Sequence, residues 1–168
     1  MNESETRAEL IDKQLAASGW GVIDDSKILR EYRITSGRIQ TGGARGKREI
    51  ADYILVYKGI KLAVVEAKSI TKEVGEGIDQ AKRYASKLQL STSYSANGKE
   101  IYQICHQTKQ EGRVECFLTP EHLWLKTFGE QNPWRENFSA VPFEDKSGSW
   151  QLRYYQEIAI QRTVEAIA

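Results

Sequence analysis

The chain has 168 residues, of which 40% are hydrophobic and 28% charged, and 24 Lys+Arg against 23 Asp+Glu give a formal net charge of +1. These values are typical of a folded globular domain and exclude disordered and collagen-like chains. No apolar run approaches the ~20 residues that span a bilayer, and the charged first residues lack the apolar core of a secretory signal. Two cysteines, Cys105 and Cys116, are too few for a disulfide framework, so we expect a cytoplasmic protein.

The first part of the chain predicts one helix followed by three strands. Residues 4–18 carry a stripe at helical spacing. The stripe consists of Ala8, Ile11, Leu15 and Ser18. Residues 28–39 contain enough β-forming residues to predict a strand. A glycine-containing basic loop follows at 41–48, and residues 49–57 and 60–68 then predict two strands joined by a short turn as an antiparallel hairpin.

The second part predicts a further helix, a strand and the start of another helix. Residues 78–90 carry a helical stripe. The stripe consists of Ile78, Ala81, Ala85 and Leu88. A turn is expected at 93–98 and a strand at 100–107, and Thr119 followed by Pro120 indicates a capped helix start. The order helix, strand, strand, strand, helix, strand predicts an α/β fold with a mixed central sheet flanked by helices.

A polar stretch at 142–149 marks an expected domain boundary, so that residues 1–148 form one domain. Residues 151–168 begin a new helical pattern with an apolar stripe. The stripe consists of Tyr155, Ala159, Ile160, Val164 and Ile167. We expect an ordered helix here that covers apolar surface on its own chain or on a neighbouring one, because an isolated helix of this length is marginal in water.

Three charged residues on the predicted hairpin are candidates for chemistry: Asp52, Glu66 and Lys68. Glu66 and Lys68 lie two apart on one strand and therefore share a face. A turn of three residues at 58–60 places Asp52 directly opposite Glu66, whereas a turn of two residues pairs Asp52 with Val65. We expect the first register, because the apolar residues that then share the face of Glu66 are Ile54, Val56, Leu62 and Val64.

Two opposed carboxylates form an oxygen-rich site for a hard cation such as Mg²⁺. The backbone carbonyl of Ala67 is a further candidate ligand, because it lies near both side chains. A bound cation polarises a phosphoryl oxygen, and Lys68 would orient the attacking water or neutralise charge that develops on the phosphate. The alternative is a strand-end ion pair of Glu66 with Lys68 or Arg48 that has no part in catalysis.

An Asp followed by Glu-x-Lys across a short hairpin, with a helix next, resembles the PD-(D/E)xK nuclease superfamily, although Ala51 stands where the usual Pro precedes Asp52. The surrounding segments resemble, over nearly the whole chain, the amino-terminal nuclease domain of the motor (R) subunit of type I restriction enzymes. These segments are Thr6-Arg7, Leu10-Ile11-Asp12, Gly19-Trp20, Arg48–Tyr53, Leu62–Lys68, Gly77–Ala81 and Ser95–Gly98. Residues 152–156 resemble the entry to the ATP-driven motor domain, so we expect residues 149–168 to begin that domain.

The resemblance implies a restriction-endonuclease-like fold and Mg²⁺-dependent hydrolysis of DNA phosphodiester bonds, leaving 5′-phosphate and 3′-hydroxyl ends. The activity would be that of a type I site-specific deoxyribonuclease, with ATP used only by the full-length subunit. The implied partners are duplex DNA and the specificity and methyltransferase subunits. The alternatives are a stand-alone repair or junction-resolving nuclease of the same superfamily and a non-catalytic DNA-binding or docking module.

The resemblance also implies roles for residues outside the hairpin. Gln80 and Tyr84, four apart on the second helix, match a Gln-x-x-x-Tyr pair that lies over the catalytic site in the resembling nucleases. An acid on the first helix approaches the metal in many superfamily members, and Glu5 and Glu9 are the candidates here, of which we favour Glu5 because it extends the helical stripe. The alternative is that both only stabilise the helix N-terminus. The basic loop could contact DNA phosphates or could be a hairpin loop without such contacts. Its candidate residues are Arg45, Lys47 and Arg48.

Overall fold

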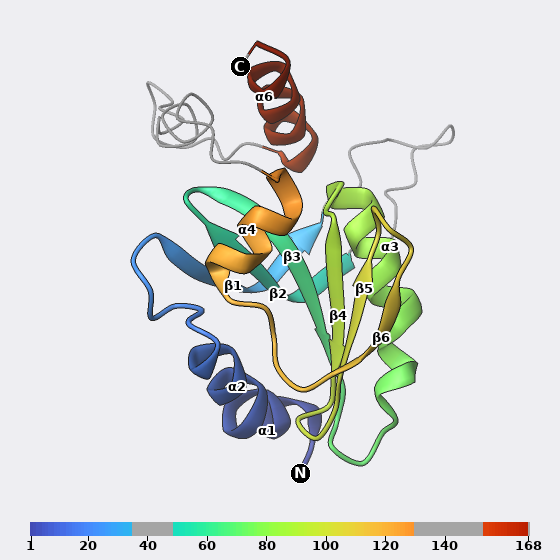
Figure 1. Cartoon of the computed structure of the whole chain (residues 1–168). Coiled ribbons are helices and arrows are strands. Elements are labelled where there is room, and N and C mark those ends of the chain that lie inside the picture. The colour runs from blue at the N-terminus through green and yellow to red at the C-terminus, as the bar shows by residue number, and fades with distance from the viewer. Residues whose placement is uncertain (35–48, 130–152, 168) are drawn as a thin grey trace, which may run out of the picture.

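A computed structural model describes residues 1–34, 49–129 and 153–167, and within the last range it leaves out the side chains of residues 164, 165 and 167. A six-stranded sheet in the order β1-β2-β3-β4-β5-β6 forms its centre (Figure 1). The strands are β1 (Ser26–Ile34), β2 (Glu49–Tyr57), β3 (Ile60–Ala67), β4 (Thr92–Ala96), β5 (Ile101–Cys105) and β6 (Glu111–Val114). β3 and β4 are parallel and all other neighbours are antiparallel. The predicted mixed sheet is therefore confirmed.

Helices cover both faces of this sheet (Figure 1). They are α1 (Glu3–Thr6), η1 (Arg7–Ile11), α2 (Asp12–Ala17), η2 (Val74–Gly77), α3 (Ile78–Leu88), α4 (Pro120–Phe128) and α6 (Tyr154–Ile167). The expected cap of α4 is confirmed, because the Thr119 side chain accepts a hydrogen bond from the backbone N–H of His122. No helix in the described part of the chain is long and apolar enough to cross a membrane.

The two faces of the sheet differ in their packing. One face packs against α2 and α4 and contains the large aromatic side chains of the core, such as Trp20, Tyr53 and Trp124. The other face packs against α3 through a smaller cluster that includes Ile54, Val64 and the small Ala85. The sequence stripe of α3 is confirmed for Ala81, Ala85 and Leu88, while Ile78 is only partly buried. The close approach of α3 brings its first turns to the strand that carries Glu66.

The sequence pattern missed β4 and β6. The segment Thr92–Ala96 contains serines and was expected to be part of a turn, yet every residue in it is buried. The serines are tolerated inside the sheet because their hydroxyls have partners: Ser93 hydrogen-bonds His106, and Ser95 donates to the carbonyl of Val74 at 2.5 Å. These hydrogen-bond partners lie far away in the sequence, so the local polarity of the segment wrongly predicted a turn instead of a buried strand.

The hairpin between β2 and β3 has the predicted register near the charged residues but not the predicted turn. Lys58 and Gly59 alone form the turn, with φ of 49° and 78°, as in the two-residue turns that match the strand twist. The register then shifts by one residue at a β-bulge between Leu55 and Val56. Tyr53 consequently pairs with Val65, and extending this register places Asp52 opposite Glu66. The bulge also turns Leu62 into the aromatic side of the core, contrary to the expectation that it shares the face of Glu66.

The first helix is interrupted by a π-helical turn, η1, which changes the buried stripe. Thr6 is buried instead of Ala8, which is exposed, because a π turn places residues five apart, Thr6 and Ile11, above one another. The expected burial of Ile11, Leu15 and Ser18 is confirmed. The wide turn also brings Arg7, the first residue of η1, to the sheet.

Helix α6 folds back on its own chain beside α3 and the start of β3. Glu157 pairs with Lys61, and Tyr154 packs against the α3 side of the core. The predicted apolar stripe is nevertheless not the side that faces the core: Tyr155 and Ile160 are 40% and 49% exposed. The side chains of Val164 and Ile167 and the expected boundary at 142–149 lie outside the described residues.

Candidate active site

The sheet opens between β2 and β3 at the point where the charged residues lie. The last paired residues are Tyr53 and Val65, and beyond them the backbone N–H of Ala67 donates to Asp52 Oδ2 at 2.8 Å in place of a ladder bond. β3 stays paired with β4 there, and the N–H of Lys68 donates to the carbonyl of Ala96 at 2.8 Å. This separation makes room for two carboxylates on adjacent strands and fixes Asp52 to the peptide that follows Glu66.

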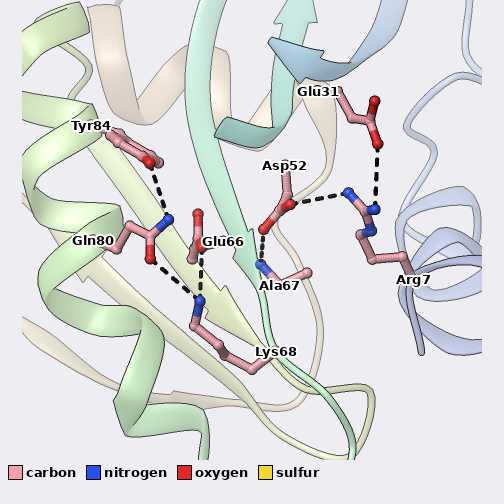
Figure 2. A network of polar contacts seen from close by, with 8 residues as sticks. All are labelled: Arg7, Glu31, Asp52, Glu66, Ala67, Lys68, Gln80 and Tyr84. Atoms are coloured by element: carbon pink, nitrogen blue, oxygen red, sulfur yellow. Dashed lines mark hydrogen bonds and ion pairs between the residues drawn. The ribbon is translucent and has the colours of Figure 1, made fainter. Parts of the chain in front are cut away.

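A chain of hydrogen bonds runs from Glu66 to α3 (Figure 2). Lys68 Nζ donates to Glu66 Oε1 at 2.8 Å and lies 3.4 Å from Gln80 Oε1. Gln80 Nε2 in turn donates to the hydroxyl of Tyr84 at 3.0 Å. The four side chains that the sequence selected on this side are therefore brought together. Tyr84 is 4% exposed and forms part of the core under α3, so its ring packs while its hydroxyl supports Gln80.

The other side of the site contains an arginine that the sequence analysis did not select for a role. Arg7 NH1 lies 3.0 Å from Asp52 Oδ1, and Arg7 NH2 lies 3.4 Å from Glu31 Oε1. Figure 2 shows the guanidinium between the two carboxylates. Glu31 lies on β1, where the register of its neighbours places it opposite Asp52, and its backbone has a φ of 51°. Asp52 thus has a hydrogen-bond partner on each of its oxygens.

Burial, neighbouring charges and hydrogen bonds set the pKa values of the two carboxyl groups. Burial and then the charge of Asp52 raise the pKa of Glu66 to about 7, against an ordinary 4.5, despite the opposing effect of Lys68. Burial also raises the pKa of Asp52, although the Ala67 N–H and the Arg7 charge oppose this. Burial lowers the pKa of Lys68, but the hydrogen bond and charge of Glu66 outweigh it, so that the pKa is raised. The lysine therefore remains a cation, and further positive charge nearby would stabilise the ionised form of Glu66.

One buried oxygen of the site lacks a partner. Glu66 is 2% exposed, and its Oε2 has no hydrogen-bond partner among the residues that the structure describes. A buried carboxylate oxygen without a partner costs free energy, and a divalent cation would remove that cost. The described residues contain no group of three His, Cys, Asp or Glu side chains that could hold a metal. Two carboxylates and a backbone carbonyl nevertheless fit Mg²⁺, which usually retains several waters.

Helix α3 reaches the site because a glycine precedes it. A Cβ on Gly77 would overlap the hydroxyl oxygen of Ser95 and lie 3.3 Å from both Glu66 Cγ and Lys68 Cε. Only a residue without a side chain permits this distance between the start of α3 and the strand. Gly77 thereby sets the position of Gln80 relative to Lys68.

Glu5, the favoured first-helix candidate, does not join this cluster. Glu5 is 58% exposed, and its carboxylate accepts a hydrogen bond from the backbone of Asn2 in a capping box. The loop residues Arg45, Lys47 and Arg48 lie outside the described residues. The first-helix acid whose charge reaches the site is Glu3, which raises the pKa values of Asp52, Glu66 and Lys68. Glu3 lies one helical turn before Arg7, and that spacing was the available signal.

A cavity of about 520 Å³ lies away from this cluster, among the ends of α3 and α4 and the helix α6. Its lining includes Lys61, His106, Phe128 and Tyr154, and none of the clustered site residues. The candidate active site is therefore the open edge between β2 and β3, where paired acids, a lysine and an amide converge.

The structure defines the chain as an α/β protein with a mixed sheet, in which acidic side chains lie where two strands separate. The profile of the family described as the second domain of the type I restriction enzyme EcoKI endonuclease subunit matches residues 32–124, more than half of the chain. The chain therefore belongs to this family of type I restriction endonuclease subunits. The matched range includes Asp52, Glu66, Lys68, Gln80 and Tyr84.

Two relatives agree with this membership. The type I restriction enzyme EcoAI endonuclease subunit of Escherichia coli is 29% identical over 181 aligned positions, which cover 97% of this chain and 22% of the relative. A solved fragment assigned to an HsdR subunit of a type I restriction enzyme from Vibrio vulnificus YJ016 is 34% identical, with a TM-score of 0.82. That match covers 99% of this chain and 32% of the solved one. The chain thus spans about a fifth to a third of the length of these relatives.

Proposed function

We propose that this chain is the endonuclease part of a type I restriction subunit and hydrolyses DNA phosphodiester bonds with Mg²⁺. The observation that carries the proposal is the buried Glu66 Oε2 without a partner, opposite Asp52 and beside a lysine. Asp12, which pairs with Arg30, also has a buried oxygen without a partner, so it is the second carboxylate, Asp52, that distinguishes this site. The family membership supports the same conclusion, because the relatives are named as endonuclease subunits.

Asp52, Glu66 and the backbone carbonyl of Ala67 would hold the metal in this PD-(D/E)xK arrangement. When bound there, Mg²⁺ supplies Lewis-acid polarisation of a phosphoryl oxygen and a lowered pKa for an attacking water. The Ala67 N–H keeps the Asp52 carboxylate turned toward β3, since it occupies Oδ2 at 2.8 Å. This fixed orientation reduces the reorganisation that metal binding would otherwise require.

In this proposal, Lys68 is the residue that acts on the phosphate. Its ammonium is held between Glu66 Oε1 and Gln80 Oε1, so its position is set from two elements. A cation in a partly dry site stabilises the negative charge that develops on the phosphate in the transition state. Gln80 and Tyr84 position the lysine rather than react, because the amide is oriented by its own bond to the tyrosine hydroxyl.

Duplex DNA is the proposed substrate, and the specificity and methyltransferase subunits are the proposed partners. Because the chain spans only 22% of its curated relative, we place sequence recognition and ATP-driven translocation in other parts of the complex. The domain division at residue 148, with the start of a motor domain after it, remains part of this proposal, as does a cytoplasmic location.

Calorimetric titration with Mg²⁺ or Mn²⁺ tests the proposal directly, with the wild type compared with Asp52→Ala. We expect saturable binding by the wild type and loss of that binding in the variant, because one of two carboxylate ligands is gone. Glu9→Ala is the matched control, since Glu9 is an exposed acid on the first helix that pairs with Lys13 at 3.3 Å. Duplex binding without any metal binding would instead identify a non-catalytic DNA-binding module.

A further inference from the structure

Arg7 occupies a position on Asp52 that a metal ligand would have to share. Its NH1 lies 3.0 Å from Asp52 Oδ1, and the two side chains are only 22% and 14% exposed. Since the other oxygen already accepts from the Ala67 N–H at 2.8 Å, Arg7 occupies the free side of the carboxylate. A divalent cation bound to Asp52 would lie close to a full positive charge, and such repulsion is substantial in a partly buried site.

The π-helical turn η1 fixes this arginine in place. Thr6, immediately before it, is fully buried, and its hydroxyl donates to the carbonyl of Asn2 at 2.8 Å and accepts from the N–H of Ile70 at 3.1 Å. Gly98 packs against the same turn, where a Cβ would lie 2.6 Å from Leu10 Cδ1. The backbone of Arg7 therefore belongs to a packed element, which holds this residue beside Asp52.

Glu31 offers the same guanidinium a second acceptor. Its carboxylate lies 3.4 Å from Arg7 NH2 and is 69% exposed, so it can form the pair without a large desolvation cost. Its residue has a φ of 51° in the middle of β1, directly across from Asp52. A planar guanidinium with several donors can keep one partner while it releases another, which an ammonium group does less well.

We propose that Arg7 is a displaceable counter-ion of the metal site: it neutralises Asp52 in the metal-free chain and transfers to Glu31 when a divalent cation binds. This inference rests on the proposed function and adds a positioning residue that regulates occupancy of the same site. In the metal-free site, Lys68 thus pairs with Glu66 and Arg7 with Asp52. The pairing of Arg7 with Glu31 favours metal binding because it removes the competing cation.

Calorimetric titration with Ca²⁺ or Mn²⁺ at fixed ionic strength, without DNA, tests this on the 168-residue chain. We expect Arg7→Gln to bind the ion about tenfold more tightly than the wild type, because the competing charge is removed. Glu31→Gln should bind it several-fold more weakly, because Arg7 then loses the charged acceptor that competes with Asp52 for it. In the Arg7→Gln background, Glu31→Gln should have almost no effect. Lys13→Gln is the control, a loss of one exposed cation from the adjoining helix α2.

Unchanged or weaker binding by Arg7→Gln would overturn the inference, since it would make Arg7 a support for Asp52 and not a competitor. An equal effect of Glu31→Gln with and without Arg7 would also overturn it, because Glu31 would then act only through its charge. Thermal melts confirm that each variant is folded, and the exposed Glu31 provides a variant with little effect on packing. Absence of binding by the wild type would refute the metal site itself, whereas wild-type binding lost in Asp52→Ala but unaltered in Arg7→Gln refutes only this inference.

Discussion

The candidate site has two sides, one around Asp52 and one around Glu66, and the two carboxylates differ in their hydrogen-bond and ion-pair partners. On the Asp52 side, each oxygen has a partner, one from the backbone of β3 and one from an arginine on η1. On the Glu66 side, one oxygen accepts from Lys68 and the other is buried without a partner. The charge of Asp52 is already compensated by a cation that has another acceptor, whereas one oxygen of Glu66 has no partner among the described residues. On our proposals, an added cation would displace Arg7 from Asp52 on one side and bind the unpartnered oxygen of Glu66 on the other.

Loss of either side should abolish cleavage, which is the largest effect we predict. In the assembled enzyme, Asp52→Ala, Glu66→Ala and Lys68→Ala should each lower the rate of DNA cleavage by roughly a thousandfold or more. ATP hydrolysis should remain largely intact, because we propose that the motor lies in another part of the complex. A nicking assay and a phosphate-release assay on the same preparations measure the two activities. Full cleavage by any one of these variants would contradict a catalytic role for the residue that it replaces.

The pH dependence of stability should show the difference between the two sides in the metal-free chain. Glu66 has a pKa of about 7 when folded against 4.5 when unfolded, so the folded chain retains a proton in this window that the unfolded chain has lost. The free energy of unfolding therefore decreases as the pH rises through this window, by roughly 2–3 kcal/mol. Glu66→Gln should remove most of this dependence. Denaturant titrations at pH 5 and pH 8 measure it, and parallel curves for the two proteins would show that Glu66 does not titrate this way.

The contact of α3 with the Glu66 side can be tested with a pair of glycines. Gly77→Ala should lower the free energy of unfolding by about 1–3 kcal/mol, because its Cβ would overlap Ser95 Oγ and press on Glu66 and Lys68. Gly75→Ala is the matched control in the same short helix, since a Cβ there meets nothing within 4 Å. Chemical denaturation of both variants measures the difference. Equal stabilities would show that α3 can move away from the strand at little cost.

Removal of the last hydrogen bond on the Glu66 side should have a smaller effect. Tyr84→Phe retains the buried ring but leaves Gln80 Nε2 without its partner at 3.0 Å, so cleavage should fall about threefold to tenfold while the melting temperature changes little. Gln80→Ala should lower cleavage somewhat more, because Lys68 then loses one of its two acceptors. Tyr84→Ala is less informative, since it also removes a ring from the core. If both Tyr84→Phe and Gln80→Ala cleave normally, the pair serves only packing.

The smallest effect is expected for a truncation remote from both sides of the site. Deletion of residues 148–168 should leave the remaining chain folded, because the strands and helix of the site precede it, and the contacts of α6 with Lys61 and with the α3 side of the core lie away from the site. A modest decrease in melting temperature is expected from the loss of this packing. A cooperative melt and retained metal binding would check this result, whereas global unfolding would make α6 part of the nuclease domain.

The sequence by itself determined the hairpin, the helix after it and the residues that face each other across the site. Period-two patterning and local turn chemistry set β2 and β3, and the spacing of four in α3 set the neighbourhood of Gln80 and Tyr84. The register at Asp52 followed from the apolar faces, even though the turn was one residue shorter than expected. A bulge compensated for the difference, because burial of Ile54 and Val64 on one face is worth more than a regular ladder.

Only the tertiary structure decided which partners complete the site. Arg7 reaches Asp52 because a π-helical turn rotates it toward the sheet. The spacing of apolar residues in the sequence did not predict that turn. β4 can form because its serines find hydrogen-bond partners on residues distant in the sequence, and β3 remains paired with β4 after β2 separates from it. These features depend on contacts between residues far apart in the chain, whose free energy is realised only when the whole fold has formed.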